Sequence, residues 1–71
     1  MLVEIDYKTI QQLQDLFSRE GLRDVVEYIE ETNDRMLNIV KIDESSRYPT
    51  VDDFFDVLDD YNIDYRIVWV N

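Results

Sequence analysis

Five aspartates fall within nine residues near the C-terminal end of the chain: Asp52, Asp53, Asp56, Asp59 and Asp60. Carboxylates in such numbers can ligate a hard cation, transfer protons, or bind the Lys and Arg side chains of a partner. The calcium-binding EF-hand loop needs a central Gly and a terminal Glu at fixed spacing, and this segment has neither. Carboxylates on a regular helix also diverge, so we expect no specific metal site.

Few other residues of the chain are of types that take part in catalysis. The chain has no His and no Cys, which excludes Cys/His zinc sites and a Ser-His-Asp triad formed from its own residues. Gly21 is the single glycine, so there is no Gly-rich phosphate loop. A general-acid carboxylate needs an apolar pocket that raises its pKa, and a domain of 71 residues can hardly enclose one. We therefore expect a protein without enzymatic activity and without a cofactor.

The charge balance narrows the choice of partner. Seventeen acids against seven bases leave a net charge of −10, which argues against direct binding to nucleic acid or to an anionic membrane. Half of that charge lies in residues 49–71, where Arg66 is the only base. No apolar run approaches membrane-spanning length and the N-terminus lacks a basic signal region, so the expected location is the cytoplasm.

Two helices are expected to position these groups within a single domain spanning residues 1–71. Thr9 is the predicted N-cap of the first helix, and Gly21 its left-handed stop. Thr50 caps the second helix with Asp53 completing a capping box, and Asn62 can end it. The apolar stripe of this second helix is formed by Val51, Phe54, Phe55, Leu58 and Tyr61, and we expect Phe54, Phe55 and Leu58 to be buried.

Strands are predicted at residues 2–5 and 65–70, whereas residues 22–43 are ambiguous. The apolar spacing of residues 22–32 fits a helix, but their β-branched content and the Asn33-Asp34 pair favour a hairpin leading into residues 36–42. We prefer the hairpin, in which Tyr28 would face Ile39. The order is then β-α-β-β-α-β, an α+β, ferredoxin-like antiparallel sheet with two helices on one face. The alternative makes residues 22–32 helical and the fold α-rich.

The aspartates of the second helix are not placed for stability. A charge run is usually only a solvated face. Here, however, like charges recur at i,i+3 and i,i+4, each pair costing roughly 0.2–0.5 kcal/mol. Asp59 and Asp60 also lie at the negative end of the helix dipole, and Asp has a lower helix propensity than Glu. Carboxylates one helical turn apart are separated by about 5–6 Å, comparable to successive phosphates of a nucleic-acid strand. We interpret this face as a surface that binds a basic protein.

In overall character the chain resembles the small acidic inhibitors encoded by phages and mobile elements, including anti-CRISPR and anti-restriction proteins that mimic DNA. The five aspartates carry this resemblance. A second acidic patch is predicted from Glu27, Glu30, Glu31, Asp34, Asp43 and Glu44. The resemblance implies an inhibitor that blocks a nucleic-acid-binding protein or nuclease complex, in the host-cell cytoplasm if the protein is phage-encoded. An immunity protein or antitoxin against a basic nuclease would use the same surface.

The predicted partner-binding set adds aromatic anchors near the acidic face. It comprises Asp52, Asp53, Asp56, Asp59, Asp60, Glu30, Glu31, Asp34, Tyr48, Tyr61 and Trp69. The alternative function is a small dimeric regulatory module of ferredoxin-like type that binds a small ligand. In that reading Tyr65, Ile67 and Trp69 share one face of the last strand, and an open apolar face of the sheet allows a homodimer.

Overall fold

The computed structural model describes residues 1–7, 9–32 and 37–70. It confirms the predicted element order and shows a strand where the alternative placed a helix in residues 22–32. The elements are β1 (Leu2–Asp6), α1 (Ile10–Arg19), β2 (Val26–Glu31), β3 (Leu37–Ile42), α2 (Val51–Asp60) and β4 (Asp64–Trp69).

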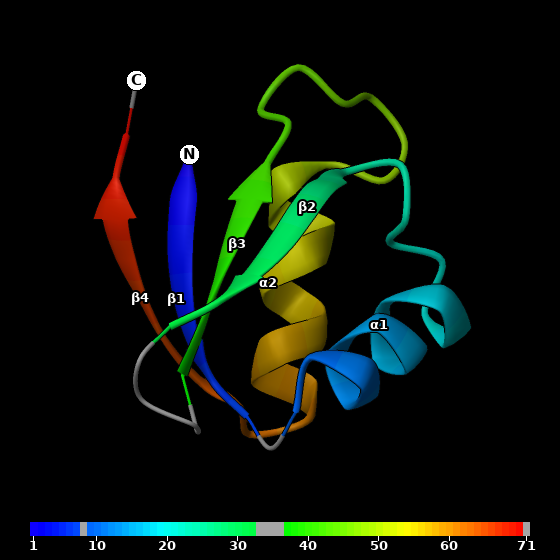
Figure 1. Ribbon diagram of the computed structural model, residues 1–71. Helices are drawn as coiled ribbons and strands as arrows, with labels where there is room; N and C mark the ends of the chain where they lie inside the picture. The colour runs from blue at the N-terminus through cyan, green and yellow to red at the C-terminus, as the bar shows by residue number, and fades with distance from the viewer. Residues whose placement is uncertain (8, 33–36, 71) are drawn as a thin grey trace.

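The four strands form one antiparallel sheet in the order β2-β3-β1-β4, so β2 and β4 are its edges (Figure 1). With a helix between β1 and β2 and another between β3 and β4, this is the ferredoxin-like α+β arrangement. The predicted fold class is therefore confirmed.

Both helices begin at a threonine N-cap. The Thr9 hydroxyl accepts a hydrogen bond from the Gln12 backbone N–H at 3.1 Å. Thr50 and Asp53 form a full capping box, with the Thr50 hydroxyl accepting from the Asp53 N–H at 3.2 Å and the Asp53 carboxylate accepting from the Thr50 N–H at 2.9 Å. The predicted starts of both helices are confirmed, because these side chains satisfy backbone donors that have no partner inside the helix.

Both helices also end in the same way, at a residue with positive φ. Gly21 has φ +70°, and the next N–H, that of Leu22, bonds the Phe17 carbonyl at 2.8 Å. Asn62 has φ 54° and stands in the same position after α2. No helix in the described ranges is long and apolar enough to cross a membrane.

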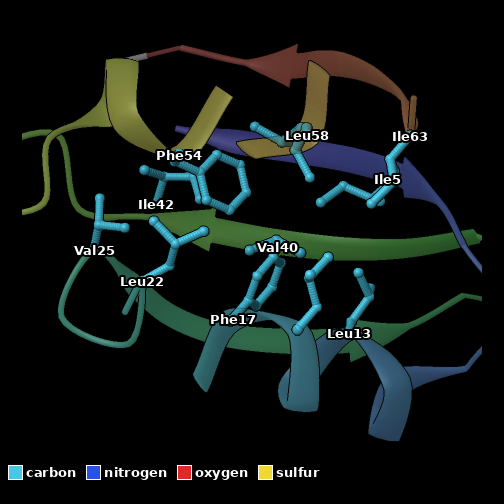
Figure 2. Close-up of a cluster of buried hydrophobic side chains, with 12 residues drawn as sticks. Ile5, Leu13, Phe17, Leu22, Val25, Val40, Ile42, Phe54, Leu58 and Ile63 are labelled. Atoms are coloured by element: carbon cyan, nitrogen blue, oxygen red, sulfur yellow. The ribbon is translucent and has the colours of Figure 1, made fainter. Parts of the chain in front are cut away.

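The core lies between the sheet and both helices (Figure 2). The Phe17 ring of α1 and the Phe54 ring of α2 are 5.4 Å apart between centroids, so both helices cover the same face. Phe54 and Leu58 are buried as expected, whereas Phe55 is only half-buried at the rim, against Tyr65. The buried apolar residues are Val3, Ile5, Leu13, Leu16, Phe17, Leu22, Val25, Val40, Ile42, Phe54, Leu58 and Ile63.

The pairing of β2 with β3 is antiparallel as expected, but its register differs by two residues. Tyr28 lies opposite Lys41 rather than Ile39. At the end of this pairing the Thr32 N–H and hydroxyl both donate to the Leu37 carbonyl, at 3.3 and 2.8 Å. The predicted Asn33-Asp34 turn lies outside the described residues.

Candidate partner-binding surface

All five aspartates of α2 are exposed. Burial of Phe54 and Leu58 against the sheet fixes the rotation of the helix about its axis, and the capping box fixes its start. The predicted acidic face is therefore assembled by one rigid element. It continues to the last turn, where α2 has no basic residue.

The five carboxylates divide between two flanks of α2. At about 100° of rotation per residue, Asp52, Asp56 and Asp59 form one row along the helix, which we call the acidic stripe. The ring of Phe55, beside this row, packs on Tyr65 of β4 at 5.0 Å between centroids. The stripe therefore faces the β4 side of the molecule, and Asp53 and Asp60 are turned toward the α1 side.

The Tyr65 hydroxyl lies in the field of the acidic stripe. Its pKa is raised above the usual value first by burial, then by the negative charge of Asp59 and the hydrogen bond it donates to that carboxylate, and also by the charge of Asp56. Asp56 and Asp59 thus place negative potential at β4 as well as over the solvent face of the helix.

The described cations of the chain form no ion pair with this face. Within the described part of the chain, ion pairs join the N-terminal amine to Glu44 at 2.7 Å, Lys41 to Glu27 at 3.3 Å, and Arg66 to Glu4 at 3.2 Å. None of them involves a residue of α2. Arg66, the base of β4, is therefore engaged with β1 on the opposite face of the sheet.

The predicted aromatic anchors lie apart from one another. Tyr48 is 88% exposed in the loop before α2. Tyr61, at the end of α2, donates a hydrogen bond to Glu20, and the Arg19 guanidinium lies 5.9 Å from its ring centroid, so it serves the contact with α1. Of these two tyrosines, Tyr48 is the one that is exposed and makes no described contact with α1.

Trp69 lies on the face of the sheet that the helices leave open, which corrects the expectation that it shares a face with Tyr65 and Ile67. Tyr65 pairs with Ile5 and Ile67 with Val3, and both partners are core residues. A register shift between Leu2 and Val3 places Trp69 opposite Leu2, on the other face. Trp69 is therefore not beside the acidic stripe.

The second acidic patch is remote from α2 and partly neutralised. Glu30 and Glu31 are exposed on β2, at the opposite edge of the sheet from β4, and Asp34 lies outside the described residues. Glu27 pairs with Lys41, and Glu44 pairs with the N-terminal amine. The structure therefore does not join these residues to the acidic stripe.

Asp43, assigned to the same second patch, has a local structural role. Its carboxylate accepts hydrogen bonds from the Ser45 hydroxyl at 2.6 Å and from the Ser45 N–H at 2.9 Å. These two bonds hold the pKa of Asp43 below its usual value. Asp43 thus stabilises the turn after β3.

A metal cluster and a ligand groove are the two other kinds of site that could give the protein a function. No group of three or more metal-ligating side chains occurs among residues 1–7, 9–32 and 37–70. An open groove of about 460 Å³ runs between α1 and β2, with a mainly polar lining that includes Gln11, Gln14, Ser18, Arg23 and Glu27. The sequence did not indicate this groove, because it arises where two separately predicted elements meet.

Sequence reasoning also missed that β4 is an edge strand with exposed apolar side chains. Ile67, Val68, Trp69 and the following Val70 are 45%, 40%, 53% and 56% exposed. Their composition indicates a strand, whereas it is the order of the described strands that places β4 at an edge of the sheet. Comparisons of the chain with protein-family models, with curated proteins and with solved structures find no match.

Proposed function

We propose that this protein is a non-enzymatic acidic inhibitor, which blocks a basic, nucleic-acid-handling surface of a partner protein through the acidic stripe. The observation that carries the proposal is the exposure of all five α2 aspartates with no ion pair to a cation among the described residues. A partner rich in Lys and Arg would supply the missing cations.

The first helix shows that the fold itself does not require such a surface. Both α1 and α2 are ten residues long and amphipathic. The exposed side of α1 nevertheless carries one carboxylate, Asp15, among glutamines and a serine, and its last turn carries Arg19, which suits the helix dipole. The fold therefore does not require aspartates on the exposed side of its helices, and their presence on α2 needs another explanation.

Binding would relieve a strain that the free protein carries. Repulsion within the stripe and the unfavourable end of the dipole at Asp59 are both removed when Lys or Arg side chains approach. Charge-assisted pairs to Arg are also strong and geometrically selective. Carboxylates repeated about every 5–6 Å along α2 would then occupy positions that a partner's basic groove reserves for phosphates.

The test is competition with nucleic acid. The immobilised protein is used to capture partners from a lysate, and each captured protein is challenged with duplex DNA, with RNA and with rising salt. We expect a basic partner that nucleic acid displaces and that salt releases, because both interfere with the same charges.

Two double variants with the same change in net charge test whether the partner binds to the acidic stripe. Asp52→Lys with Asp56→Lys reverses the stripe, and Asp15→Lys with Asp24→Lys changes two exposed aspartates of the first half by the same amount. We expect the stripe variant to lose the partner by tenfold or more in affinity and the control to keep most of it. Equal losses in the two variants, or a partner that nucleic acid does not displace, would overturn the proposal.

A further inference from the structure

The two edges of the sheet differ in how well they resist pairing with another strand. The β2 edge carries Glu27, Glu30 and Glu31, all exposed, and charged side chains protect a sheet edge. Among the described residues, no strand pairs with the outer side of β4 and no segment covers it (Figure 1). Its second half, from Ile67 to Trp69, and the following Val70 are apolar and exposed. An edge of this kind is a template for strand addition.

The side chains around the β4 edge define what an added strand would meet. On the helix side lie Tyr65 and the half-exposed Ile67, with Phe55 and the acidic stripe above them. On the open side lie Trp69, opposite Leu2, and Arg66, which pairs with Glu4. The helix side of this edge therefore carries carboxylates above apolar side chains, and the open side carries an aromatic ring and an ion-paired cation.

We propose that β4 accepts an extended segment of the basic partner as a fifth strand of the sheet. Successive side chains of a strand point to opposite faces, so the segment would alternate basic and apolar residues. Lys or Arg stems on the helix side would cover Ile67 and reach the carboxylates of Asp56 and Asp59, whereas apolar side chains on the open side would pack on Trp69. This inference rests on the proposed function, since it specifies how the basic partner binds.

Charge selects this occupant over a second copy of the chain. Antiparallel pairing of two β4 strands would place both acidic stripes on the same face of a continuous sheet, in a pair of molecules that each carry −10. Like charges brought together in this way oppose association. A basic segment at the same edge instead gains opposite charges and the same backbone hydrogen bonds.

The experiment uses an eight-residue peptide in which Lys alternates with Val. Binding is measured by titration, and hydrogen exchange of the β4 backbone amides is followed with and without the peptide. Two further peptides carry N-methyl groups, one on every Lys amide and the other on every Val amide. In a strand, alternate residues direct their N–H groups to opposite edges, so only one of the two sets can face β4.

We expect the parent peptide to bind and to slow exchange in β4. One methylated peptide should bind at least tenfold more weakly, and the other should bind like the parent. If both methylated peptides bind like the parent peptide and β4 exchange does not slow, the peptide does not add as a strand. In that case the strand-addition inference is wrong, and the proposed function of the acidic stripe is not affected. Failure of the parent peptide to bind also overturns the inference. Protection of β4 in the free protein, together with a dimeric mass, would assign the edge to a second copy.

Neutralising variants separate this result from a failure of the proposed function. Asp56→Asn with Asp59→Asn should weaken the parent peptide about as much as the unfavourable methylation does, and Asp15→Asn with Asp24→Asn should not. If the peptide binds both variants as tightly as it binds the parent protein, the carboxylates of Asp56 and Asp59 do not contribute to binding. The argument that the added segment is basic would then be wrong.

Discussion

The first half of the molecule, β1-α1-β2, and the second, β3-α2-β4, share one framework with different surfaces. Each helix has ten residues and a Thr N-cap. Each is followed by a residue with positive φ, Gly21 or Asn62, and then by a buried apolar residue, Leu22 or Ile63. The framework thus depends on caps and core positions. These leave the outer residues free to vary.

The outer residues differ in charge and in apolar exposure. In the first half α1 is mixed polar and its edge strand, β2, carries glutamates, as expected for a surface that only meets water. In the second half α2 is uniformly acidic and β4 ends in exposed apolar residues. Because the framework is shared, the difference is not imposed by the fold, and it is the difference that the proposed binding role of the second half would require.

The largest expected effect tests the shared core. Phe54 is fully buried between the two helices and contacts Phe17, so Phe54→Ala should destabilise the domain by about 3–5 kcal/mol. Phe55→Ala should cost clearly less, because Phe55 lies half-buried at the rim. Urea denaturation of both variants measures the difference. Equal losses would mean that the rim contact with Tyr65 belongs to the core.

The next largest effect compares the two helix ends. Gly21 has φ +70°, and a Cβ there meets no atom within 4 Å, so Gly21→Ala is opposed by backbone conformation alone. We expect a loss of roughly 1–2 kcal/mol in the free energy of unfolding. Asn62→Gly, at the equivalent position with φ 54°, should be neutral or slightly stabilising. A loss at Asn62 as large as that at Gly21 would show that the Asn62 side chain is itself needed.

The sequence predicted the features that depend on neighbouring residues. Thr9, Thr50, Gly21 and Asn62 carry their capping role in their chemistry and local spacing, and the structure confirms each of them. The exposure of the five α2 aspartates was predictable for the same reason, since helical periodicity places all of them away from Phe54 and Leu58.

Features that depend on strand register were not predictable. In β3 both alternating sets contain apolar residues, so the pattern does not say which set faces the core. The structure buries Val40 and Ile42, and with them Asn38, whose Nδ2 has no hydrogen-bond partner among the described residues. The face of Trp69 likewise depends on a register shift in a pairing between residues far apart in the chain. The spacing of residues along one strand does not predict which set of β3 side chains faces the core, nor on which face Trp69 lies.

A smaller effect sharpens the contrast between the helix surfaces. Asp60 lies in the last turn of α2, where α1 has Arg19, so Asp60→Lys should stabilise the isolated domain by about 0.3–1 kcal/mol at low salt. Asp59 is not suited to this test, because it accepts a hydrogen bond from Tyr65. Thermal unfolding at low and high salt measures the gain, which should shrink as salt rises. A loss of stability would mean that Asp60 makes a structural contact.

The smallest expected effect concerns pH and the flank of α2 that faces β4. The folded protein holds the Tyr65 proton more tightly than the unfolded chain, since burial and then Asp59 raise the pKa of Tyr65 above its usual value. The resulting stability is complete below the unfolded pKa and is lost as pH rises through the higher folded pKa.

Asp59→Asn should lower the Tyr65 pKa and reduce this loss of stability at alkaline pH. Asp60→Asn, with the same charge change on the other flank, should leave both nearly unchanged. The difference in tyrosinate absorbance between each protein and its Tyr65→Phe derivative isolates this one hydroxyl. If the two Asn variants shift the titration equally, the field at Tyr65 comes from the net charge of α2, and the stripe has no special relation to β4.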